Sequence, residues 1–340
     1  MDRRVFLKAS ALGTLTSARV TLGEHRVVSV APLIVEFDLS TLGGVYTPIE
    51  DFYVRNHGPI PRDLGGILRI EGEVADPQTV RYDDLASSPK RELAAVLECA
   101  GNPVRPSALV SNGIWEGWPL ENILMRARPH PSATHLHLLG RDQYVRSVPL
   151  DRARGAAMLV THLNGRPLRA RQGAPWRVLF PGWYGMDSVK WLQAIVVSGS
   201  ALPSNDLAYV ELTKLHSGSI EQRALPRIQV KSIICSPADG SVLHSGKTII
   251  RGVAWSGEAT VSTVEVSRDG GESWHPANVE PGTGYGWATW QLDLEVQRGT
   301  AEFLCRATDE KTNKQVPMRD SARLDGYVNN WYHRIRCVIV

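Results

Sequence analysis

From residue 227 onward, short runs rich in β-branched and aromatic residues alternate with turn signals at intervals of about ten residues. Between two of these runs lies Arg268-Asp269-Gly270-Gly271, which is typical of a hairpin because glycine supplies the positive φ of a tight turn. Strands this short and this evenly spaced predict two antiparallel sheets packed face to face. The predicted strands are residues 228–235, 247–255, 260–268, 274–279, 285–294, 302–308 and 333–340.

The preceding part, residues 30–215, mixes short apolar runs with many chain breakers. The whole chain of 340 residues holds 30 Gly and 21 Pro, which favours strands and turns over a helical bundle. We therefore predict an α+β domain over residues 26–225 and an all-β, immunoglobulin-like sandwich over residues 226–340. Expected strands are residues 66–72, 134–139 and 177–180, and expected short helices are residues 82–86 and 120–125.

Composition excludes several classes of protein. The chain has 38 Lys+Arg against 35 Asp+Glu, a net charge of +3, which is too mild for a nucleic-acid-binding surface. No run of 18 or more apolar residues occurs, so no membrane span is expected in the mature chain. Four cysteines in 340 residues are too few for a disulfide scaffold.

The N-terminus resembles an export signal. Arg3-Arg4-Val5-Phe6-Leu7-Lys8 has the pattern of a bacterial twin-arginine signal, and a mildly apolar stretch interrupted by Arg19 follows it. We expect residues 1–25 to direct the folded protein to the periplasm. The alternative is an ordinary basic N-terminus on a cytoplasmic protein.

The segment Leu97-Glu98-Cys99-Ala100-Gly101-Asn102 places a cysteine where an apolar run breaks into a loop. A thiolate in such a loop is a candidate nucleophile or ligand of a soft metal. The alternative is a small buried hydrophobic residue, and this interpretation is kept for Cys235, Cys305 and Cys337, which lie within strand-like runs.

Three cations on other loops, Arg55, Arg177 and Lys190, accompany asparagine and histidine donors and Gly-Pro turns. Guanidinium groups and free backbone N–H groups are suited to an anionic, phosphate-bearing ligand. Neither Gly-x-Gly-x-x-Gly nor a P-loop occurs, so a nucleotide is a poor candidate. Taken singly, each cation also fits a solvated surface charge.

Several of these motifs occur in this order in the sulfite oxidase family of molybdenum enzymes, which the chain resembles over roughly residues 45–340. The segment 262–274 and the ending 330–337 are similar to that family's dimerisation domain. The motifs are Arg55-Asn56-His57, Cys99-Ala100-Gly101-Asn102, Asn164-Gly165-Arg166-Pro167-Leu168, Pro181-Gly182 and Ser188-Val189-Lys190-Trp191-Leu192.

The resemblance implies a molybdenum–molybdopterin cofactor with Cys99 as the protein's metal ligand. It implies oxidation of sulfite to sulfate by oxygen-atom transfer, with Arg55, Arg105 and Tyr209 as catalytic residues, and a homodimer. The chain has no Cys-x-x-Cys-His motif, so a haem is expected on a separate electron acceptor such as a cytochrome c. The implied cofactor-binding residues are Arg55, Asn56, His57, Asp142, Gln172, Arg177, Ser188 and Lys190.

Three positions depart from the family's pattern. Gln172 replaces a pterin-binding histidine, Arg105 is displaced by one position, and Thr283 stands where sulfite-oxidising members have an anion-binding arginine. These departures leave open another sulfur compound as substrate, or reduction of a sulfoxide or N-oxide. A third alternative is a non-catalytic binding protein, because sandwich domains serve many functions.

Overall fold

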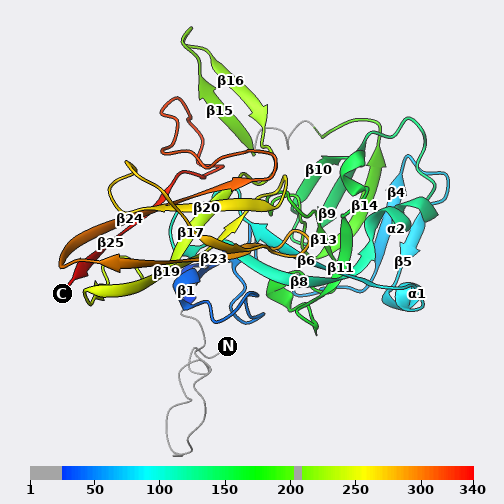
Figure 1. Ribbon diagram of the computed structural model, residues 1–340. Coiled ribbons are helices and arrows are strands. Elements are labelled where there is room, and N and C mark those ends of the chain that lie inside the picture. Colours follow the sequence, from blue (N-terminus) through cyan, green and yellow to red (C-terminus); the bar gives the residue numbers. More distant parts are fainter. Residues whose placement is uncertain (1–24, 203–208) are drawn as a thin grey trace, which may run out of the picture.

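The computed structural model describes residues 25–202 and 209–340, and the predicted export signal lies almost wholly outside this part of the chain. Below, the described residues up to 225 are called the first half of the chain, and residues 226–340 the second half. Figure 1 shows the mixed sheets of the first half beside a long β-sandwich formed by the second half. Two short α-helices occur among the described residues, α1 (Tyr82–Ala86) and α2 (Leu120–Arg126), at the places that the sequence predicts. No helix in this part of the chain has the length and apolar character needed to span a bilayer.

The first core lies between two five-stranded sheets. One has the order β10-β9-β14-β4-β5, in which β14 pairs parallel with β4 and antiparallel with β9. Its strands are β4 (Leu68–Gly72), β5 (Gln78–Val80), β9 (His135–Gly140), β10 (Val145–Pro149) and β14 (Leu192–Ser198). The other joins β12-β11-β8-β6, with β13 also paired to β11. Its strands are β6 (Arg91–Glu98), β8 (Val110–Pro119), β11 (Met158–Leu163), β12 (Arg166–Pro167) and β13 (Arg177–Leu179).

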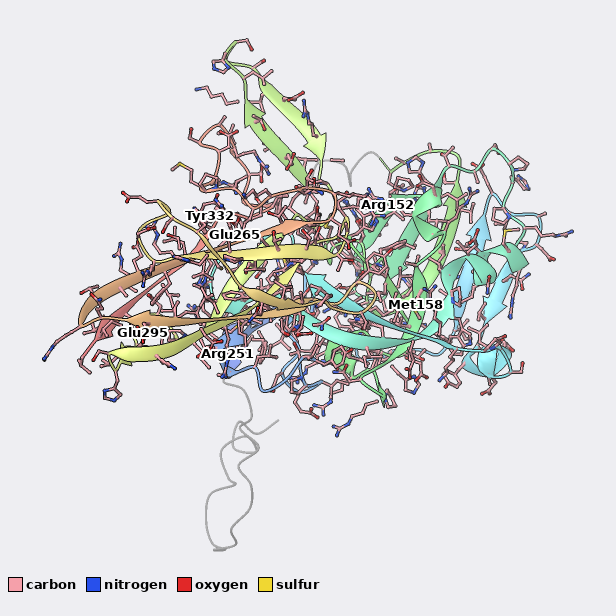
Figure 2. All side chains as sticks on the ribbon, viewed as in Figure 1. Arg152, Met158, Arg251, Glu265, Glu295 and Tyr332 are labelled. Carbon is pink, nitrogen blue, oxygen red and sulfur yellow. The ribbon has the colours of Figure 1, made fainter. Side chains whose placement is uncertain are left out.

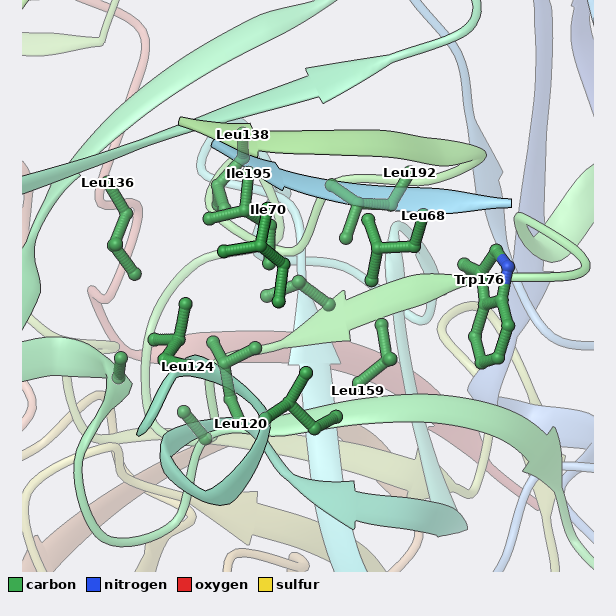
Figure 3. Packing of buried hydrophobic residues seen from close by; sticks show 14 of the residues in the cluster. Leu68, Ile70, Leu120, Leu124, Leu136, Leu138, Leu159, Trp176, Leu192 and Ile195 are labelled. Carbon is green, nitrogen blue, oxygen red and sulfur yellow. The ribbon is translucent and has the colours of Figure 1, made fainter. Parts of the chain in front are cut away.

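Apolar side chains from both sheets and from α2 fill the space between them. Figure 3 shows Ile70 and Ile195 on one side facing Leu159 and Leu124 on the other, all of them buried. Close approach within the second sheet depends on Gly117, since a Cβ there would lie 2.0 Å from the Leu159 carbonyl oxygen. Packing of this kind fixes the loops at the strand ends, where the candidate site forms.

Segments before residue 110 form a further four-stranded sheet, and a separate hairpin projects from the molecule (Figure 1). The sheet consists of β1 (His25–Val30), β2 (Leu33–Asp38), β3 (Val54–Arg55) and β7 (Ser107–Ala108). The hairpin consists of β15 (Val210–Lys214) and β16 (Ile220–Ala224). Three short 3₁₀ helices, Leu39–Thr41, Leu150–Ala153 and Ala170–Gln172, lie in connecting segments.

The second half forms the two packed sheets that the sequence predicts, around one shared core. One sheet holds β17 (Lys231–Ser236), β19 (Gly246–Trp255), β22 (Asn278–Glu280) and β23 (Ala288–Val296). The other holds β18 (Val242–Leu243), β20 (Val261–Ser267), β21 (His275–Pro276), β24 (Gly299–Asp309) and β25 (His333–Ile339). Every predicted run overlaps a strand, and residues 274–279 divide between β21 and β22. The two-residue β18 is too short to leave a periodic signal.

Acid is expected to weaken this sandwich through His333. The side chain is 4% exposed, and its Nδ1 accepts a hydrogen bond from the Ile234 backbone N–H at 3.1 Å. Burial lowers the pKa of His333 from 6.5 to about 4. The contribution of the neutral His333 to the free energy of unfolding is therefore complete above pH 6.5 and is lost as the pH falls toward 4. At pH 5 this loss is about 2 kcal/mol.

Urea unfolding at pH 7.5 and pH 5 measures this effect as the difference between wild type and His333→Asn. The variant is expected to lose about 2 kcal/mol less on acidification than the wild type. Equal losses in the two proteins would contradict this assignment.

Candidate active site

Nine of the residues singled out in the sequence line one pocket in the first half of the chain. They come from strand ends and loops that are far apart in sequence. The pocket encloses about 660 Å³, counting the open space at its mouth. The nine residues are Arg55, Asn56, His57, Cys99, Asp142, Arg177, Ser188, Lys190 and Tyr209.

Cys99 begins the loop that follows β6 and is half-buried. The loop is a tight turn in which the Asn102 backbone N–H donates to the Cys99 carbonyl oxygen at 2.9 Å. Burial raises the pKa of the Cys99 thiol, while a backbone hydrogen bond from Gly101 and the charge of Arg55 act in the opposite direction. The described residues contain no group of three His, Cys, Asp or Glu side chains able to hold a metal ion.

Lys190 lies deep in the pocket and is held by carbonyl groups. Its Nζ donates to the Arg55 carbonyl oxygen at 3.2 Å and to the Asn56 side-chain oxygen. The left-handed Gly173 (φ 104°) makes room for it, since a Cβ there would lie 2.7 Å from the Lys190 side chain. Burial and the nearby Arg177 charge lower the pKa of Lys190 well below its usual value.

Arg177 lies on β13 and is 5% exposed. Burial lowers its pKa from 12.5 to about 10. Its Nε and the side-chain nitrogen of Asn56 are buried without a hydrogen-bond partner among the described residues. Buried unpaired donors beside desolvated cations are costly alone, so this wall of the pocket fits a group rich in anionic oxygen acceptors.

His57 and Tyr209 form a hydrogen-bonded pair at the pocket, between His57 Nε2 and the Tyr209 hydroxyl. The His57 ring stacks on Tyr144 with centroids 4.6 Å apart. Burial, followed by the charges of Arg55 and Lys190, lowers the pKa of His57 to about 4. Burial and the neighbouring Cys99 raise the pKa of Tyr209 to about 12. At neutral pH the pair therefore consists of an uncharged imidazole and a protonated phenol.

Asp142 and Ser188 are tied to the backbone around them. The Asp142 carboxylate accepts from the Tyr144 N–H at 3.2 Å, and burial raises the Asp142 pKa. The Ser188 hydroxyl oxygen accepts from the Phe180 N–H at 3.1 Å.

Two predicted site residues do not line the pocket. The Gln172 side chain accepts from the Arg169 N–H at 3.1 Å and donates to the Ile49 carbonyl oxygen at 2.6 Å, so both ends of its amide are engaged in holding the loop. Gln172 thus does not line the pocket, and its predicted contact with the cofactor stays a prediction. Its carbonyl oxygen instead accepts from Arg177 Nη1 at 3.0 Å, which orients that guanidinium.

Arg105 is the second predicted site residue that lies outside the pocket. Its guanidinium pairs with the buried carboxylate of Glu36 at 2.6 Å and donates to the Ser107 carbonyl oxygen at 2.9 Å. These contacts draw Arg105 toward β2 and β7 and away from the pocket, and its catalytic role stays a prediction. Thr283 is exposed and does not line the pocket either.

Sequence reasoning missed several pocket residues, including Tyr53, Tyr144 and Arg171. Tyr144 follows Asp142 by two positions in the same turn, which is a weak signal of its location. Tyr53 directly precedes the Val54-Arg55 strand, but no residue type in its surroundings distinguishes it from a core aromatic.

Two family models together match most of the chain. The oxidoreductase molybdopterin binding domain matches residues 57–205, and the Mo-co oxidoreductase dimerisation domain matches residues 222–339. Cys99 and most of the pocket residues lie within the first match, whereas Tyr53, Arg55, Asn56 and Tyr209 lie outside it. The chain is therefore an oxidoreductase enzyme whose cofactor is molybdenum–molybdopterin.

Comparison with known proteins identifies the family. The sulfite oxidase of Gallus gallus is 32% identical over 334 residues, covering 85% of this chain and 72% of that protein. The mitochondrial sulfite oxidase of Drosophila melanogaster is 32% identical over 351 residues, and the match spans 60% of its length and 87% of this chain. The chain belongs to the sulfite oxidase family.

A solved structure shares the fold over almost the whole chain. The sulfane dehydrogenase SoxCD from Paracoccus pantotrophus matches with a TM-score of 0.83 and 25% sequence identity, covering 96% of this chain and 92% of that one.

The described residues fit the cofactor. The unpaired donors of Asn56 and Arg177, with the cation of Lys190, are suited to the phosphate and pterin of molybdopterin. Cys99 is suited to a soft metal such as molybdenum.

Proposed function

We propose that this enzyme oxidises sulfite to sulfate by oxygen-atom transfer and passes the electrons to a cytochrome c on a separate polypeptide. The observation that carries this proposal is that Cys99, Arg55 and Tyr209 line the same pocket. The names of the curated relatives from Gallus gallus and Drosophila melanogaster support the same substrate.

The residues of the pocket divide the work between binding and orientation. Arg55, Lys190 and Arg177 give it a positive field that attracts an anionic substrate and holds an anionic cofactor. The bound cofactor supplies a metal that exchanges two electrons and an oxygen atom with the substrate. The Tyr209 hydroxyl keeps its proton at neutral pH and donates it in a hydrogen bond to a substrate oxygen. His57 holds that hydroxyl in place.

Oxidation of a different sulfur compound is the second candidate. Two observations favour it: Arg105 pairs with Glu36 outside the pocket, and the uncharged Thr283 stands where sulfite-oxidising members have an anion-binding arginine. Both leave the site with fewer cations than a site for sulfite is expected to have. The structural match to a sulfane dehydrogenase is consistent with this alternative.

Three further assignments complete the proposal. Residues 1–25 act as a twin-arginine signal, so the enzyme works in the periplasm. The chain divides into a molybdopterin-binding domain over residues 26–225 and an immunoglobulin-like domain over residues 226–340. The second domain forms a homodimer, in keeping with the dimerisation domain model that matches residues 222–339.

A metal measurement followed by a substrate assay tests the function. Purified protein is expected to hold about one molybdenum per chain and to reduce ferricyanide when sulfite is added. Metal-loaded protein that leaves sulfite untouched but oxidises another sulfur compound would establish the second candidate. Protein that contains no molybdenum when produced in a host that makes the cofactor would contradict both.

A further inference from the structure

A buried ion pair joins the second half of the chain to the strand that carries Cys99. Lys231 opens β17, and its Nζ lies 2.6 Å from the carboxylate of Glu98, the last residue of β6. The side chains are 2% and 1% exposed. Burying two charges this deeply carries a large desolvation cost. A gain in folding stability is therefore a weak explanation for the presence of this ion pair.

Each oxygen of the Glu98 carboxylate is hydrogen-bonded. Oε1 accepts from the Asn102 side chain at 2.9 Å as well as from Lys231, and Oε2 accepts from Trp255 Nε1 at 2.8 Å. Asn102 in turn accepts the Leu109 backbone N–H at 2.8 Å through its side-chain oxygen. Glu98 therefore links both ends of the Cys99 loop to two residues of the sandwich.

The same loop receives two more contacts from the second half. The Val328 N–H donates to the Ala100 carbonyl oxygen at 3.0 Å, and the Asn329 side chain donates to the Asn102 carbonyl oxygen at 3.1 Å. Glu98, directly before Cys99, is thus held from β17 and β19, and the residues after Cys99 are held from the segment before β25.

We propose that the Glu98–Lys231 pair is a positioning device through which the second half of the chain fixes the Cys99 thiolate at the metal. The inference rests on the proposed role of Cys99 as the metal ligand. Because Cys99 is bonded directly to Glu98, a change in the orientation of that carboxylate moves the backbone from which the sulfur projects. Hydrogen bonds from Asn102 and Trp255 make the orientation specific, which an apolar contact cannot do.

Two variants of the holoenzyme separate positioning from stability. Lys231→Met leaves the buried carboxylate without its cation, and Glu98→Met with Lys231→Met removes both charges together. Glu265→Gln breaks the Glu265–Arg306 pair, 2.7 Å long, within the sandwich and serves as the control. Figure 2 labels Glu265, which lies on the sandwich. The readouts are molybdenum per chain, thermal midpoint, and the thiolate-to-molybdenum charge-transfer band per bound molybdenum.

Lys231→Met is expected to lower the thermal midpoint by about 10 °C and to reduce molybdenum per chain severalfold. In the double variant, Glu98→Met with Lys231→Met, the charge-transfer band per bound molybdenum is expected to be shifted from that of the wild type. This shift is expected whether or not the thermal midpoint of the variant recovers. Glu265→Gln is expected to keep the wild-type band. A wild-type band in both Lys231 variants would overturn the inference while leaving the proposed function intact. A wild-type protein with molybdenum but without such a band would instead count against Cys99 as the ligand.

Discussion

Cys99→Ser is expected to reduce turnover on the order of a thousandfold, which corresponds to about 4 kcal/mol of lost transition-state stabilisation. Cys99 is the protein thiolate in the pocket, and a hard hydroxyl is a poor ligand for a soft metal. The loss is expected in kcat, because the cations that attract the substrate remain in place. Steady-state kinetics on metal-loaded protein, with molybdenum measured on the same sample, checks this result.

Cys235→Ala is the matched control. Cys235 lies on β17, away from the pocket, and burial raises its pKa to about 12. Its removal is expected to leave turnover unchanged. The ligand assignment fails if Cys99→Ser keeps a tenth or more of the wild-type turnover per bound molybdenum.

The sequence predicts the part of the site that lies in compact motifs. Arg55, Asn56 and His57 are adjacent, Ser188 and Lys190 are two positions apart, and their residue types already indicate an anion site. The loop with Cys99 is recognisable because small residues follow it. The sandwich is predictable for a similar reason, since the period of two in a run such as Val264–Val266 is a local property.

Sequence reasoning does not predict which distant residue a given side chain contacts. Arg105 and Gln172 have suitable side chains near suitable motifs, yet Glu36 and Ile49 engage them from distant segments. Lys231 lies 133 positions from Glu98, and no local pattern connects the two residues. Such pairings are set by how the sheets pack, which one sequence read by its motifs does not specify.

Asp187 stands in the chain between the pocket residues Met186 and Ser188. Its removal is expected to cost about as much free energy of unfolding as Cys99→Ser costs in transition-state stabilisation. Asp187 is fully buried, and its carboxylate binds Arg146 Nε at 2.7 Å and Arg152 Nη1 at 2.6 Å. Its neighbour Ser188 lines the pocket, and Arg146 lies 5.4 Å from the centre of the Tyr209 ring.

Asp187→Ala removes the shared carboxylate from two partly buried guanidinium groups. The expected loss is about 3–5 kcal/mol in the free energy of unfolding, because a buried charge deprived of its partner is strongly destabilising. Urea unfolding of wild type and variant measures it. Turnover per folded molecule is expected to fall as well, since Arg146 no longer holds its place against Tyr209.

Glu116→Gln provides the comparison for an ion pair of similar length in contact with solvent. Glu116 lies 2.6 Å from Lys90, and the two side chains are 22% and 28% exposed. Solvent screening limits such a pair to about 1 kcal/mol or less. If Asp187→Ala lowers the free energy of unfolding by no more than Glu116→Gln does, other contacts hold Arg146 and Arg152 in place. Asp187 then has no part in maintaining the pocket wall.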